Sequence, residues 1–105
     1  MAQPESLDEV RAGLTAETAR IRWTELGRHF ARGVVIRVDV ELDLVEVAAC
    51  MVRDEKEALE KWLASGRVAH PSEAEAAGWY ERSAEFWAVV TAPWVIVQEI
   101  PPSED

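Results

Sequence analysis

Three carboxylates alternate along one short segment of the chain, at Asp39, Glu41 and Asp43. In an extended segment such alternate side chains lie on one face, about 6.6 to 7 Å apart, and their spacing matches the opening of a calcium-binding loop. The rest of the loop is missing, because its required glycine falls on Leu44 and its bidentate glutamate on Cys50. We therefore interpret these carboxylates as a solvated strand face followed by a helix cap.

Two histidines and one cysteine are the other residues that could do chemistry: His29, Cys50 and His70. They lack the close, paired spacing of zinc ligands, so we expect no metal site. Cys50 stands between Ala49 and Met51, which favours a buried thiol over a nucleophile. His29 is interpreted as a surface residue of a helix. His70 precedes a proline in a connection, where side chains often reach clefts, and is the better candidate for a binding site.

Motifs of the common enzyme classes are missing from the sequence. The five glycines form neither a phosphate-binding loop nor a dinucleotide fingerprint, and there is no nucleophile elbow or helical zincin motif. We therefore expect no cofactor and favour a non-enzymatic role. An enzyme with an unrecognised site stays open as an alternative.

Five tryptophans are many for 105 residues. Most should line a shared core, but so small a domain has difficulty burying all five, and a tryptophan at the surface is a typical anchor of an interface or a ligand cleft. Trp87 and Trp94 are the candidates for such a surface, since they flank Pro93 at the end of an expected hairpin.

The formal net charge of −9 is unevenly distributed. Residues 1–37 carry six arginines and five acids, whereas residues 38–105 carry five bases and fifteen acids. Phosphate backbones are repelled by acidic surfaces, so nucleic-acid binding is not expected, apart from a weaker alternative through Arg20, Arg22, Arg28 and Arg32. Without a secretory leader, a membrane-spanning stretch or a cysteine pair, the chain is expected to be cytoplasmic and not bound to a membrane.

Four segments match the helix capping box, in which a first side chain and the residue three positions later satisfy each other's amide groups. They are Ser6–Glu9, Asp43–Glu46, Asp54–Glu57 and Ser72–Glu75. The first predicts two consecutive helices, or one bent helix, from residue 7 to Gly33. The second predicts a buried helix from residue 44 to about residue 52. The third predicts a helix that stops at Gly66, and the fourth a helix containing residues 76–80.

Strands are predicted where the apolar period changes to two or where aromatic and β-branched residues accumulate. These segments are residues 34–39, 86–91 and 94–98, with a short strand at residues 67–70. We expect a single α+β domain with two layers, in which four or five short capped helices pack on one face of a small, mainly antiparallel sheet. The three longer strands are its central members. The alternative is a mainly helical domain with a single hairpin. The ordered core is expected over about 7–99, with flexible tails at 1–5 and 101–105.

Several stretches together resemble a bacterial family of uncharacterised proteins, domain of unknown function 2288. They are Ala16-Glu-Thr-Ala-Arg-Ile21, Leu42-Asp-Leu-Val-Glu-Val-Ala48, Lys61-Trp-Leu-Ala-Ser-Gly66, Trp87-Ala-Val-Val90 and Ala92-Pro-Trp-Val95. The similarity extends from about Leu14 to Gln98. It implies a bacterial, stand-alone protein and provides no catalytic residue or cofactor to transfer.

Two functional hypotheses follow from these observations. The first is a small interaction or regulatory protein that binds a protein partner, or a second copy of itself, through Trp87 and Trp94. The second is a small-molecule binder or enzyme in which Asp39, Glu41 and Asp43 converge with His70 and a wall of tryptophan.

Overall fold

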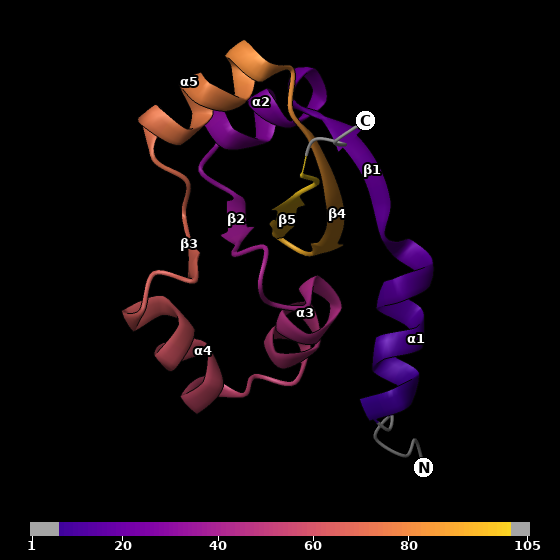
Figure 1. The fold of residues 1–105 in the computed structure, drawn as a ribbon. Helices are drawn as coiled ribbons and strands as arrows, with labels where there is room; N and C mark the ends of the chain where they lie inside the picture. Colours follow the sequence, from indigo (N-terminus) through magenta and orange to yellow (C-terminus); the bar gives the residue numbers. More distant parts are fainter. Residues whose placement is uncertain (1–6, 102–105) are drawn as a thin grey trace.

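Among the described residues, three apolar segments form the centre of a five-stranded sheet, in which the strand order is β1-β4-β5-β2-β3. Strand β5 (Trp94–Glu99) pairs with β4 (Glu85–Thr91) in antiparallel and with β2 (Val35–Val38) in parallel orientation. These are the three predicted central strands. The predicted α+β class with a mainly antiparallel sheet is confirmed. The computed structural model describes residues 7–101 (Figure 1).

Two short strands complete the sheet at its edges. Strand β3 (Val68–Ala69) pairs with β2 and confirms the predicted short strand. Strand β1 (Ala19–Arg22) pairs with β4 and lies where the sequence pattern predicted a junction between helices. Four residues are too few for a recognisable period, and Ile21 alone of the four is partly buried. Pairing with β4 therefore determines the conformation of this segment.

In the part of the chain that the structure describes, five helices accompany the strands: α1 (Leu7–Glu17), α2 (Trp23–Ala31), α3 (Leu44–Val52), α4 (Lys56–Ala64) and α5 (Glu73–Arg82). Asp43 caps α3 as predicted, because its carboxylate accepts from the amides of Val45 and Glu46. The predicted box at the start of α5 is also confirmed. The predicted Ser6 cap and the predicted tails, apart from Pro101, lie outside the described residues.

The predicted cap at the start of α4 is wrong. Asp54 has a left-handed backbone, with a φ of 55°, and the N-cap position falls on Glu55, whose side chain makes no capping bond. Helix α4 ends before Gly66 as predicted, and that glycine adopts a φ of 76°. A left-handed conformation at this position favours glycine, which has no Cβ to clash.

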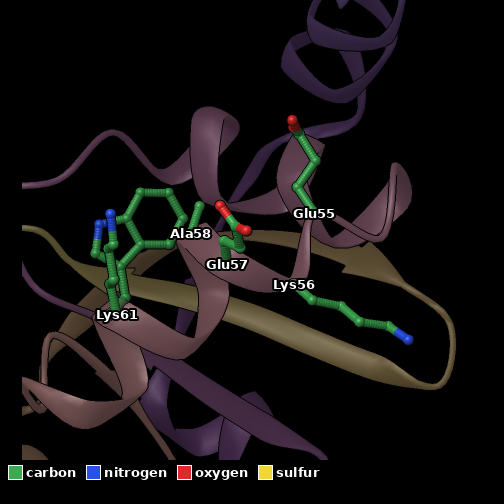
Figure 2. Close-up of a pocket in the computed structure, with 6 residues that line it drawn as sticks. Glu55, Lys56, Glu57, Ala58 and Lys61 are labelled. Atoms are coloured by element: carbon green, nitrogen blue, oxygen red, sulfur yellow. The ribbon is translucent and has the colours of Figure 1, made fainter.

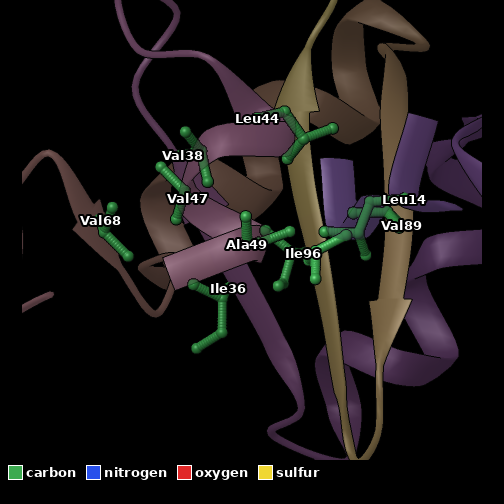
Figure 3. Close-up of a cluster of buried hydrophobic side chains, with 11 residues drawn as sticks. Leu14, Ile36, Val38, Leu44, Val47, Ala49, Val68, Val89 and Ile96 are labelled. Carbon is green, nitrogen blue, oxygen red and sulfur yellow. The ribbon is translucent and has the colours of Figure 1, made fainter. Parts of the chain in front are cut away.

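The helices lie on both faces of the sheet, whereas the sequence predicted that they cover one face. Successive residues of a strand point to opposite faces, and on β2 Val35 and Ile36 belong to different buried clusters. The first cluster joins Ile36 to α1 and α3, and Figure 3 shows it around Leu14, Val47 and Ile96. The second joins Val35 to α2 and α5. Figure 1 accordingly shows α2 and α5 together on one side and α3 on the other.

An ion pair fastens α1 to α3 beside the first cluster. Arg11 donates from Nε and Nη2 to the two carboxylate oxygens of Glu46, each over 2.7 Å. Such paired hydrogen bonds stabilise the ionised carboxylate. The hydrogen bonding with Arg11 holds the pKa of Glu46 below its usual value of 4.5 and raises the pKa of Arg11.

We predict that this ion pair makes the stability of the protein depend on pH. A carboxylate whose pKa is lower in the folded state stabilises the fold above its unfolded pKa, and this contribution is lost as the pH falls through the folded pKa. The variant Glu46→Gln should therefore unfold at lower urea concentration than the wild type at neutral pH. The difference should shrink towards zero below about pH 4.

The variant Glu57→Gln is a suitable control, because Glu57 is exposed on α4 and forms no ion pair within residues 7–101. Its urea midpoint should follow that of the wild type at every pH. A Glu46→Gln deficit of constant size from neutral to acidic pH would contradict the ionic origin of the contribution.

Candidate functional site

The candidate site is an open hollow of about 440 Å³ where β4 and β5 meet the segment that leads into α3. We call it the Trp87 hollow. It is lined by Thr18, Glu41, Leu42, Asp43, Leu44, Val45, Trp87 and Gln98. Three of the candidate residues from the sequence, Glu41, Asp43 and Trp87, are therefore brought together in one place.

Trp87 presents its indole to this hollow from a central strand. On β4 it lies opposite Gln98 of β5 on one side and Arg20 of β1 on the other, and its relative exposure is 40%. The guanidinium carbon of Arg20 lies 5.5 Å from the centre of the indole ring, in a cation–π contact. Arg20 also pairs with Glu85, with 3.2 Å between Nη2 and Oε1. Trp87 is therefore partly exposed and contacts a charged neighbour on the adjacent strand.

The acidic wall of the hollow is a short loop held by its own hydrogen bonds. The carboxylate of Asp39 accepts from the amide of Glu41 over 2.8 Å, and the carboxylate of Asp43 caps α3. Gln98 donates from Nε2 to the carbonyl oxygens of Asp39, over 2.8 Å, and Leu42, over 2.6 Å. Gln98 therefore joins β5 to a loop more than fifty positions earlier in the chain.

From the sequence, Gln98 was predicted only as the end of a strand, and its hydrogen bonds to the acidic loop were not predicted. One feature of the sequence indicates such a role: an amide side chain ends an otherwise apolar run. A partly buried amide needs hydrogen-bond partners. The identity of those partners depends on the tertiary fold.

The polar side chains that line the hollow are either exposed or already engaged in hydrogen bonds. Glu41 and Asp43 are exposed, and the hydroxyl of Thr18 is committed to the carbonyl oxygen of Leu14 over 2.7 Å. Neither histidine lines the hollow. The residues that line the hollow therefore do not pair a general base with a positioned nucleophile.

His70 and Trp94 meet at a different place. Their rings are 5.8 Å apart in an edge-to-face contact, and Trp94 packs on the first buried cluster. Trp94 also lines a shallow groove of about 530 Å³ with Met51, Val52, Asp54, Leu59, Thr91 and Ala92. Trp94 lies beside the turn, opposite Thr91, whereas Trp87 is near the other end of the hairpin, opposite Gln98. The expectation that both tryptophans flank the hairpin end is wrong for Trp87.

The thiol of Cys50 is buried on α3, as the sequence predicted. Burial raises the pKa of Cys50, with a smaller contribution from the negative charge of Glu55. A thiol with a raised pKa is mostly protonated at neutral pH and is a poor nucleophile. Cys50 is therefore a core residue.

A second hollow of about 470 Å³ lies at the start of α4 and is lined by Glu55, Lys56, Glu57, Ala58, Lys61 and Trp62. In Figure 2 the side chain of Lys56 extends away from Lys61, and Glu55 points in a third direction. Its polar groups diverge, so this surface lacks the convergent groups of a ligand site.

Within residues 7–101 no cluster of three or more histidine, cysteine or acidic side chains is arranged to hold a metal ion. In the same part of the chain, every helix is too short or too polar to cross a membrane.

The fold is that of a small α+β domain whose surface carries the Trp87 hollow. The chain belongs to the family described as "Protein of unknown function (DUF2288)", whose model matches residues 9–99. The family resemblance drawn from the sequence is thus confirmed. The fold is also similar to the NMR solution structure of PA1075 from Pseudomonas aeruginosa, with 42% sequence identity and a TM-score of 0.77 over 95% of this chain and 90% of that one. No functionally curated protein matches this chain.

We predict that Gln98 is needed to hold the acidic loop. The variant Gln98→Leu removes the Nε2 donor, so the carbonyl oxygens of Asp39 and Leu42 lose this hydrogen-bond partner. The loss should lower the free energy of unfolding by about 1–3 kcal/mol. Urea denaturation checks this value. Gln98→Glu keeps the size of the side chain but also removes the donor, so it should lose at least as much. Wild-type stability in both variants would show that the bonds from Gln98 are dispensable.

Proposed function

We propose that this chain is a small cytoplasmic interaction protein of bacteria that acts by binding a protein partner at the Trp87 hollow. The observation that carries the proposal is that the partly exposed Trp87 lines the same hollow as two exposed carboxylates. These carboxylates belong to a loop that is held by hydrogen bonds. Tryptophan is enriched among the residues that dominate binding energy at protein interfaces. A site that is ordered before binding loses less conformational entropy when the partner docks.

The uneven charge of the chain supports a protein partner over nucleic acid. Of the four arginines considered for nucleic-acid contact, Arg20 pairs with Glu85 and stacks on Trp87. The segment that forms the acidic loop and most of the sheet carries ten more acids than bases. A phosphate backbone would meet repulsion over this surface.

A small-molecule site or an enzyme is the alternative proposal. Its supporting observation is the volume of the hollow, which falls within the range of ligand pockets. It has less support than the protein-interaction proposal, because His70 packs against Trp94 and is not among the residues that line the hollow.

The proposed function predicts capture of a stoichiometric protein partner that depends on Trp87. Tagged wild-type protein and the variant Trp87→Thr, which keeps a residue suited to a strand, are used to recover partners from the native bacterial lysate. The wild type should retain the partner and Trp87→Thr should lose it. Bound proteins, nucleic acid and metabolites are all analysed in the recovered fraction.

Two further variants make the comparison specific. Tyr80→Ala removes an aromatic side chain that is 71% exposed on α5, and it should keep the partner. Trp94→Ala tests the groove at the other end of the hairpin. Equal recovery by Trp87→Thr and the wild type would contradict the proposed site, and a small molecule in place of a protein would favour the alternative. Circular dichroism and thermal melting verify that each variant is folded.

A further inference from the structure

We infer that the occupant of the Trp87 hollow is an arginine side chain within a basic segment of the partner protein. The inference rests on the proposed function, because it assigns the chemistry of the partner at the same site. It is carried by three observations: the contact already made by Trp87, the acids of the hollow that form no ion pair within residues 7–101, and the interactions of the nearby cations.

The first observation is that the indole of Trp87 already accepts a guanidinium. Arg20 lies 5.5 Å from the ring centre, while Glu85 holds the same arginine from β4. Arg20 is not among the residues that line the hollow, so this contact leaves the hollow itself open. A guanidinium that enters the hollow can meet the same aromatic side chain, and arginine is the commonest protein cation in such contacts.

The second observation is the state of the acids in the hollow. Glu41 and Asp43 form no ion pair within residues 7–101, although both line the hollow with Trp87. Capping of α3 engages one carboxylate oxygen of Asp43, which can still accept a hydrogen bond at the other. A planar guanidinium has five donors, so it can satisfy carboxylates and stack on an indole at the same time.

The third observation is that the nearby cations are committed elsewhere. Arg11 lies close enough to Asp43 for their charges to interact, but it binds both carboxylate oxygens of Glu46. Arg20 is held by Glu85. The mouth of the hollow therefore has an excess of negative charge, which attracts a basic segment and repels an acidic one.

Because the acidic loop is ordered before binding, the hollow should select a partner by its shape as well as by its charge. Asp39, Glu41 and Gln98 lock the loop before any partner is bound. A single exposed pair contributes little in water, so the partner needs several basic residues around the arginine that enters the hollow. Binding should accordingly weaken as the salt concentration rises.

A peptide titration tests the inference directly. The probe is a short peptide of alternating arginine and serine, and its matched control carries citrulline, which has the shape of arginine without the charge. Binding to the full isotope-labelled chain is followed by NMR, through the indole N–H of Trp87 and the backbone amides of residues 39–43. The arginine peptide should shift these signals in a salt-dependent way, and the citrulline peptide should leave them unchanged.

Variants distinguish the hollow from the general acidity of the chain. The double variant Glu41→Gln/Asp43→Asn removes both charges while asparagine preserves the cap of α3, and it should weaken peptide binding roughly tenfold. Trp87→Thr should weaken binding to a similar degree. The control Glu57→Gln/Glu60→Gln removes the same number of charges from α4 and should change the affinity less than about twofold.

Three results would overturn the inference. They are equal binding of the citrulline peptide, equal weakening by the α4 control, and signal shifts spread evenly over the acidic surface. The natural partner provides a separate test. If its capture from lysate requires Trp87 but survives Glu41→Gln/Asp43→Asn, the proposed function stands and the basic partner is wrong. If its capture is independent of Trp87, the proposed function itself fails.

Discussion

Strand β5 imposes the constraint on which the rest of the structure depends. Its residues Val95, Ile96 and Val97 are consecutive and all buried. Successive side chains of a strand point to opposite faces, so both faces of β5 must be covered. Helices α1 and α3 cover one face, and α2 and α5 cover the other. The same burial explains why β5 lies between β4 and β2 in the sheet, with no exposed edge of its own.

The local elements could be predicted because their signals are contained in a few neighbouring residues. Asp43 and Ser72 cap helices as expected, since a capping side chain bonds to amides two or three residues away. The aromatic and β-branched runs of β4 and β5 were equally clear. At Asp54 the same pattern failed, because that residue takes a left-handed conformation before α4 begins. A matching spacing of residues does not guarantee the backbone conformation that the cap requires.

The parts that could not be predicted depend on contacts between distant segments. Strand β1 exists because β4 lies beside it, and Arg20 meets Trp87 only through that pairing. The sequence suggested that the acids lie near His70 and a wall of tryptophan, but it could not show that Trp87 lies beside the acids while His70 packs on Trp94. The packing of helices on both faces has one local signal, which is the continuous apolar run of β5. That run was ambiguous until its partners were known.

The position of β5 within the sheet has a consequence for how the chain acquires its structure during synthesis. Within residues 7–101, the central strand of the sheet is made after the other strands and the helices, since residues 94–99 follow them along the chain. Until that segment is available, β2 lacks its parallel neighbour and β4 lacks its hairpin partner. Domains are synthesised from the N-terminus, and pairings between distant segments form slowly because they must close long loops. The helices can form early, but the sheet that unites them must assemble as a late and cooperative event.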